Sequence, residues 1–185
     1  RIAMARLPYL DKEDLKPEDQ ELLARGINLQ KILVHSPGAT RAHGAMGQYI
    51  RYGSTMDARL REMAILQVGW LAKSPYEWSH HVKIGFDFGV SEYDIRNLIA
   101  ESAGTDTDLA PIDKAVLRAA REMTLDGKVA DDTYAALADH FSNEHLIDLL
   151  VTMAFYNAVV RFLASTEMDV EESYQPYLDQ FPLPD

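Results

Sequence analysis

The 185-residue chain contains no cysteine. This absence excludes disulfide bonds, thiolate nucleophiles and thiol redox cycling within these residues. Positive charge is also scarce, because the chain has 18 Lys and Arg residues and 29 Asp and Glu residues, which gives a formal net charge of −11. Nucleic acids and anionic membranes both bind cationic patches, so an acidic surface disfavours them as partners. We therefore expect neither partner.

Membrane and export signals are also lacking. We find no stretch that we expect to span a bilayer, and the first residues do not show the basic and then apolar pattern of a signal peptide. A cytoplasmic location is therefore the default expectation. The length is enough for one domain with a real core, and we predict a single domain over residues 1–185.

Apolar residues recur at helical spacing along most of the chain, and no segment alternates as a strand would. We therefore predict an all-α protein. Residues 1–16 are expected to form an irregular arm and residues 169–185 a C-terminal tail. The predicted helices run over residues 17–26, 29–35, 37–53, 58–72, 75–89, 92–101, 111–126, 132–140 and 142–163.

The most informative stretch is the octet Ser-Pro-Tyr-Glu-Trp-Ser-His-His at residues 74–81. Ser74 is a good N-cap and Pro75 suits the first turn of a helix. On that helix Glu77 and His81 are four residues apart, so their side chains share one face. A carboxylate beside an imidazole can move protons near neutral pH. An equally open interpretation of Glu77 and His81 is an ion pair on the surface with a structural role only.

Several other polar residues allow both a functional and a structural interpretation. His80 also lies within reach of Glu77, so one of the two histidines is expected to be structural. Glu62 lies in a nearly apolar run, where it either takes part in chemistry or pairs with Arg59 or Arg61. Asn157 and Arg161 lie on a long apolar helix, where they bind a substrate carboxylate or anchor the helix. A metal site is disfavoured, because a second Glu-x-x-His segment is missing.

Three segments together resemble the carboxymuconolactone decarboxylase-like family, which includes AhpD-like alkylhydroperoxidases. These are Leu-Arg-Glu-Met-Ala-Ile-Leu at 60–66, Tyr-Glu-Trp-Ser-His-His at 76–81 and Gly-Val-Ser at 89–91. The resemblance spans residues 40–100, and the segment 155–162 is similar to the closing helix of longer members. It implies an all-α, AhpD-like bundle of about eight helices. It also implies homo-oligomers, trimers or hexamers, with sites near subunit contacts.

The family contains two chemistries, and this chain departs from one of them. Where the peroxidase branch has a Cys-x-x-Cys pair, this chain has Ser74 and Glu77, followed by His81. Glu62 matches the proton-relay glutamate of that branch. Without thiols, disulfide-linked peroxide reduction cannot run. In the decarboxylase branch a glutamate precedes the histidine by four residues, as Glu77 precedes His81.

The resemblance thus implies cofactor-free acid–base chemistry on a small lactone or cyclic acid, such as γ-carboxymuconolactone. We assign His81, Glu77 and Glu62 as catalytic, with His81 as the acid and Arg161 or another cation near the substrate carboxylate. The predicted substrate-binding residues are Tyr76, Trp78, His80, Asn157 and Arg161. Two alternatives stay open: an AhpD-like, peroxidase-related protein without thiol chemistry, and a helical oligomer that binds a small apolar ligand without catalysis.

Overall fold

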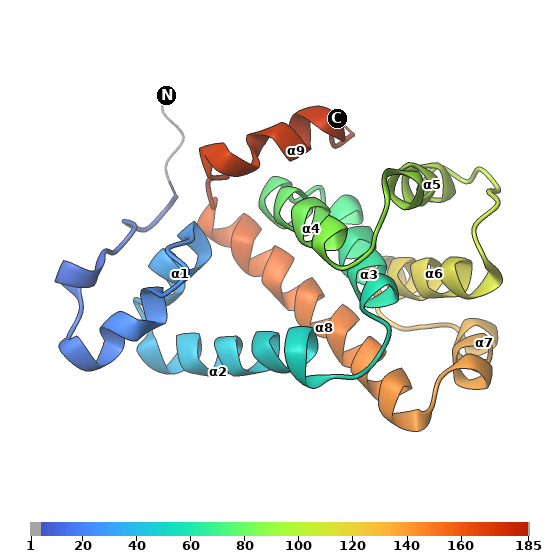
Figure 1. The fold of residues 1–185 in the computed structure, drawn as a ribbon, viewed down its shortest axis with the longest axis horizontal. Coiled ribbons are helices and arrows are strands. Elements are labelled where there is room, and N and C mark those ends of the chain that lie inside the picture. Colours follow the sequence, from blue (N-terminus) through green and yellow to red (C-terminus); the bar gives the residue numbers. More distant parts are fainter. Residues whose placement is uncertain (1–4, 185) are drawn as a thin grey trace.

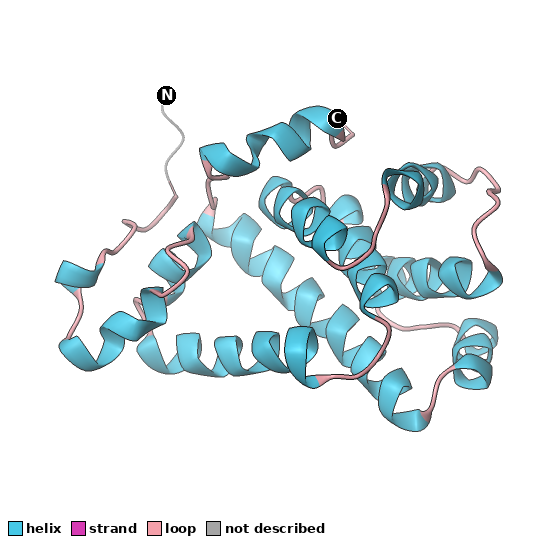
Figure 2. Ribbon diagram, in the orientation of Figure 1, coloured by secondary structure: helices cyan, strands magenta, loops and turns pink. Residues whose placement is uncertain are grey.

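The computed structural model describes residues 5–184, and all regular secondary structure within that range is helical (Figures 1 and 2). The predicted all-α class is confirmed. The α-helices are α1 (Asn28–Leu33), α2 (Pro37–Gln48), α3 (Ala58–Leu71), α4 (Pro75–Asp87), α5 (Glu92–Ser102), α6 (Pro111–Asp126), α7 (Asp131–His140), α8 (Asn143–Thr166) and α9 (Gln175–Gln180). Short 3-10 helices are η1 (Lys12–Asp14), η2 (Pro17–Leu23) and η4 (Glu172–Tyr174), and η3 (Tyr49–Gly53) is a π-helical turn.

Helix α3 is the centre of the fold. It packs against α4, α6 and α8, and its ten consecutive residues 60–69 are all buried. A helix that is buried on every side must be apolar nearly all round, as the sequence of this segment is. The buried run nevertheless includes three polar side chains, Arg61, Glu62 and Gln67. Each of them needs a partner inside the protein.

Two hydrophobic clusters lie against α3. One gathers side chains from α3, α6, α7 and α8, including Leu149 and Met153. The other joins α3 to α4, α5 and the C-terminal segment, with Trp78 and Phe181 among its members. Figure 1 shows α1, α2 and α8 arranged as three sides of a triangle, with α3 and α4 beside α8. The site described below is built on this frame.

Local sequence signals explain where the central helices begin. The Asp57 carboxylate accepts the Leu60 N–H at 2.8 Å and caps α3. The Ser74 hydroxyl accepts the Glu77 N–H at the start of α4. Ser91 and Asp94 form a capping box at the start of α5. These short-range bonds set where α4 starts and hence where its polar face lies.

The C-terminal segment corrects one expectation. Residues 169–184 are not a loose tail: they form η4 and α9, and α9 packs against α4. The Phe181 side chain is 1% exposed, and its carbonyl oxygen accepts the Trp78 indole N–H at 2.8 Å. The predicted N-terminal arm is largely irregular apart from η1, and residues 1–4 lie outside the described range. Asp169 holds the arm through the Ala5 N–H and the Tyr9 hydroxyl.

Helix α8 corrects a second expectation. By length and composition alone, its 24 residues would be enough to cross a membrane, although we expected no such stretch from the sequence. In the fold 56% of its most apolar window is buried, and α8 contacts α3, α4, α6 and α7. Its apolar surface therefore serves the core of the bundle.

Candidate active site

A pocket of about 480 Å³ opens between α1, α2, α4 and α8. The polar side chains that line it include Glu77, His80 and His81 from α4, which are three of the residues selected from the sequence. Aromatic rings of Tyr76, Phe155 and Tyr156 also line it. The pocket thus combines an apolar wall with a few convergent polar groups, as small-molecule sites generally do.

His81 lies between two carboxylates. Its Nδ1 donates a hydrogen bond of 2.6 Å to Glu62 Oε2 on α3, and its Nε2 lies 3.0 Å from Glu77 Oε1, one turn away on α4. The edge of the imidazole meets the Tyr156 ring, with ring centroids 5.0 Å apart. Glu77 lines the pocket, whereas Glu62 lies behind His81 and is fully buried. Packing of α3 against α4 thus brings the three predicted catalytic residues together.

The two carboxylates decide the charge of His81. Burial lowers its pKa, but the charges of Glu62 and Glu77 and their hydrogen bonds outweigh this effect, so the pKa is raised above the ordinary value. For Glu62, burial raises the pKa, and the charges and hydrogen bonds of His81 and Arg61 outweigh it, so the pKa is lowered. The arrangement therefore favours an imidazolium held against an ionised Glu62.

Arg61 balances the second negative charge of this buried group. It is 2% exposed, and its Nε donates a 2.9 Å hydrogen bond to Glu62 Oε1. Its guanidinium also lies over the Phe88 ring, 4.6 Å from the centroid. Of the two partners considered for Glu62 from the sequence, Arg61 is the one observed. Arg59 instead pairs with Asp94 and Asp113.

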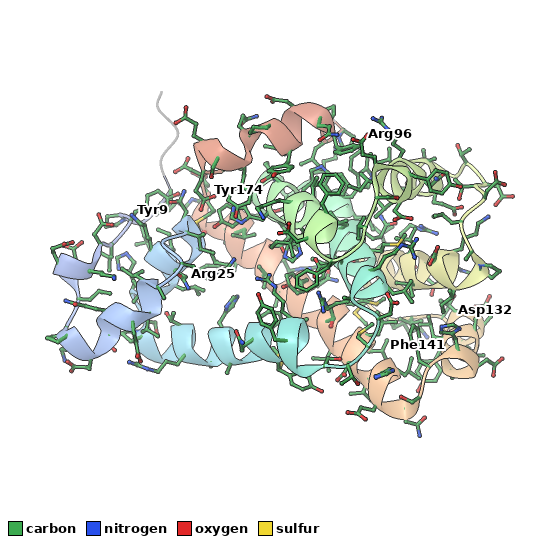
Figure 3. All side chains as sticks on the ribbon, in the orientation of Figure 1. Tyr9, Arg25, Arg96, Asp132, Phe141 and Tyr174 are labelled. Atoms are coloured by element: carbon green, nitrogen blue, oxygen red, sulfur yellow. The ribbon has the colours of Figure 1, made fainter. Side chains whose placement is uncertain are left out.

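His80 lies in a different environment from His81. Its Nε2 donates a 2.7 Å hydrogen bond to Glu171 Oε2 in the C-terminal segment. Its ring is stacked between those of Tyr76 and Tyr174, with centroid distances of 4.1 and 3.6 Å. Burial lowers the pKa of His80, although Glu171 opposes the shift, so the neutral form is favoured. Tyr174 is the last residue of η4 and is labelled in Figure 3.

Arg51 and His43 are among the pocket residues that the sequence analysis did not select. Arg51 in η3 lines the pocket, and the guanidinium interacts with Tyr156 and Glu62. Its side chain has no ion pair with a carboxylate among residues 5–184. His43 on α2 lines the pocket as well. Sequence spacing carries no signal for either, because helix packing decides which face of α2 and η3 borders the pocket.

This fold and site can now be compared with known proteins. Residues 37–123 match the carboxymuconolactone decarboxylase family. The match confirms the resemblance seen in the sequence and covers α2 to α6, including the Glu62–His81–Glu77 group. No curated protein matches the chain.

Solved structures similar to this chain have an AhpD-like fold. A peroxidase-related protein with an alkylhydroperoxidase AhpD core, from Ralstonia eutropha JMP134, is 20% identical with a TM-score of 0.73, over 94% of this chain and 95% of that one. A peroxidase-related protein from Silicibacter sp. TM1040 is 19% identical with a TM-score of 0.71, over 93% of each chain. A Cys-to-Ala variant of the debrominase Bmp8, in complex with 2,3,4-tribromopyrrole, is 18% identical with a TM-score of 0.73, over 97% of each chain. The predicted AhpD-like bundle is confirmed.

Within this AhpD-like fold, three predicted substrate-binding residues lie away from the pocket. Trp78 is buried against the C-terminal segment. Asn157 donates to the Thr124 hydroxyl and the Met153 carbonyl, and Arg161 donates to Asn157. None of the three lines the cavity, so the predicted role of Arg161 as the cation beside the substrate is not supported. Tyr76 and His80 do line it.

The charged residues of the site mainly form hydrogen bonds and ion pairs with one another. Among residues 5–184, no group of three or more His, Asp or Glu side chains is arranged to hold a metal ion. The arginines that line the pocket are Arg51, which is partly buried, and Arg25, which is exposed and is labelled in Figure 3. The arrangement can therefore attract an anion and exchange a proton with it.

Proposed function

We propose that this protein is a cofactor-free acid–base enzyme that acts on a small organic anion. The observation that carries the proposal is the Glu62–His81–Glu77 group, in which a raised-pKa imidazole meets a pocket that also presents Arg51. General acid catalysis needs a proton donor that is loaded near neutral pH. His81 meets this requirement because two carboxylates stabilise its charged form.

The three residues have different roles in this proposal. His81 is the acid, and Glu62 holds its ring through the 2.6 Å hydrogen bond to Nδ1. Glu77 is the carboxylate that faces the pocket, where its Oε1 atom is buried and makes no well-directed hydrogen bond. Glu77 thus lies where it can pass a proton between His81 and a bound molecule.

Arg51 replaces Arg161 as the cation proposed for the substrate carboxylate. It lines the pocket and forms no direct ion pair with a carboxylate among the described residues, so its guanidinium can pair directly with a substrate carboxylate. The net charge of −11 would otherwise repel an anion. A local arginine is therefore needed for an acidic substrate to bind.

The finer proposal is decarboxylation of a γ-carboxylated unsaturated lactone. The bond between the ring and its carboxylate breaks, CO2 leaves, and the electron pair delocalises onto the lactone carbonyl as a dienolate. The proton of His81 then passes through Glu77 to the dienolate carbon, and His81 takes up a new proton from water. The family match supports this reaction, and the raised pKa of His81 supplies the donor.

Turnover of γ-carboxymuconolactone, followed by NMR in D2O, tests the proposal. We expect loss of CO2, one deuterium incorporated per turnover, and a rate at least 100-fold lower in His81→Gln. His140→Gln is the matched control, because His140 is exposed and outside the pocket. A panel of lactones with no turnover would exclude the decarboxylase. Peroxide consumption with a reductant in its place would favour the peroxidase-related alternative, and ligand binding unaffected by His81→Gln would favour the binding protein.

We also propose, from the family resemblance, that the chain forms trimers or hexamers. Exposed apolar side chains on α2 and η3, namely Met46, Tyr49 and Tyr52, support an association surface beside the pocket. Light scattering coupled to size-exclusion chromatography tests this. A monomer at micromolar concentration would contradict it.

A further inference from the structure

One face of α2 and η3 lines the pocket from end to end. The lining residues are Thr40, His43, Gly44, Gly47, Gln48, Arg51 and Tyr52. Their spacing follows the 3.6-residue period, so all of them project from the same side of one helical rod. This face lies across the pocket from the acid–base group on α4, and the catalytic proposal makes no use of it apart from Arg51.

Gly44 and Gly47 place no side chain on this face. A Cβ atom built at Gly44 or Gly47 would meet no other atom within 4 Å, so neither glycine is required by close packing. Neither has the positive φ that would require glycine. Glycine inside a helix nevertheless lowers its stability relative to alanine. Since both line the pocket, the space left by their missing side chains belongs to the cavity.

His43 lies one turn before Gly47 on the same face. Its Nε2 atom is buried and makes no hydrogen bond within residues 5–184. The ring packs against Phe155, with centroids 5.0 Å apart. Burial lowers the pKa of His43, although Glu77 opposes the shift, so the neutral imidazole is favoured. A buried polar atom without a partner is costly, and a ligand that supplied the missing hydrogen bond would remove the cost.

We propose that α2 is the specificity face of the pocket: Gly44 and Gly47 admit a flat ring, and His43 Nε2 binds a hydroxyl or oxo group on it. His43 and Arg51 are eight residues apart, which separates them by about two turns along α2 and η3. A ring whose carboxylate meets Arg51 can therefore direct a substituent at its opposite end toward His43. The substrate class is a flat cyclic carboxylate with a polar group across the ring. This rests on the proposed function only for Arg51 as the carboxylate site.

Binding of three probes to the whole chain, measured by calorimetry, tests the role of His43. The probes are 4-hydroxybenzoate, benzoate and trans-4-hydroxycyclohexanecarboxylate, which differ in the hydroxyl group and in ring flatness. We expect the wild type to bind 4-hydroxybenzoate about tenfold more tightly than either of the others, as one buried hydrogen bond allows. His43→Phe keeps the ring packing on Phe155 and should lose the preference over benzoate. A preference that survives in this variant, or a wild type that binds none of the probes, would overturn the proposal.

Gly47→Ala tests the flat-ring cradle. The added methyl group should raise the dissociation constant of 4-hydroxybenzoate about tenfold or more, while better helix propensity raises Tm by about 2–4 °C. A binding defect in a more stable protein cannot be attributed to misfolding. Gly38→Ala is the matched control, since Gly38 lies on α2 with equally open surroundings but outside the pocket. An unchanged dissociation constant in Gly47→Ala would refute the cradle.

These outcomes are separable from those of the proposed function. Failure of His81 as an acid shows as lost deuterium incorporation and leaves the three dissociation constants unaffected. Failure of the α2 face shows as lost selectivity among the probes, even if a lactone is turned over.

Discussion

Glu62→Gln is the sharpest test of how the fold controls His81. The substitution keeps the size of the side chain and removes the charge that accepts the 2.6 Å hydrogen bond from Nδ1. A hydrogen bond to a charged group contributes about 1.5–3 kcal/mol, which corresponds to about 1–2 pKa units. Because the charge and hydrogen bond of Glu62 are among the causes that raise the pKa of His81, that pKa should fall in the variant, while the Glu77 carboxylate remains in place.

The same substitution changes stability in two ways. Arg61 is left buried without its carboxylate, so the free energy of unfolding at pH 7 should fall by about 3–5 kcal/mol. In the wild type, the raised pKa of His81 contributes stability that is fully present below the unfolded pKa and is lost as pH rises through the folded pKa. With a smaller upward shift in the variant, less of this contribution is present below the unfolded pKa and less is lost as pH rises.

Two measurements check these expectations. NMR titration of the histidine side chains reports the pKa of His81, and urea unfolding between pH 5 and 8 reports the free energy of unfolding for both proteins. Glu13→Gln is the control, because Glu13 is exposed and far along the chain from the site. A pKa of His81 that is no lower in folded Glu62→Gln than in the wild type would refute the reasoning. Circular dichroism establishes that the variant is folded.

The remaining predictions concern stability. Phe181→Ala should lower the free energy of unfolding, measured in urea, by about 3–5 kcal/mol, because the ring is 1% exposed within the core cluster. The control is Tyr93→Ala, which removes an exposed aromatic side chain. Equal losses in the two variants would contradict a packed C-terminal segment. Asp57→Ala should cost about 1 kcal/mol through loss of the α3 cap, and Asp57→Asn should restore most of it; an Asn variant as unstable as the Ala variant would show that the cap is not the cause.

Much of the fold follows from short-range signals. The caps Asp57, Ser74 and Ser91 stand where the helices α3, α4 and α5 begin, because each hydroxyl or carboxylate bonds a backbone N–H three residues on. The closeness of Glu77 and His81 likewise follows from helix geometry alone. Apolar periodicity was enough to predict the all-α class, since it reflects which face of each helix is buried.

The partners of the site come from distant parts of the chain. Glu62 meets His81 only because α3 packs on α4, and Glu171 reaches His80 over a separation of 91 residues. Spacing along one helix carries no information about such contacts, and so Trp78, Asn157 and Arg161 were placed in the pocket when they lie outside it. The α2 face was missed for the same reason, since its glycines are informative only beside a cavity.

The sequence by itself determined the helices, their caps, the pairing of Glu77 with His81 and the exclusion of thiol chemistry. These depend on residue type and on contacts within one or two turns. The tertiary structure alone decided that His81 is held between two carboxylates, that Arg51 lines the pocket beside it, and that residues 169–184 fold back onto α4. Those features depend on helix packing, which joins side chains that the sequence leaves far apart.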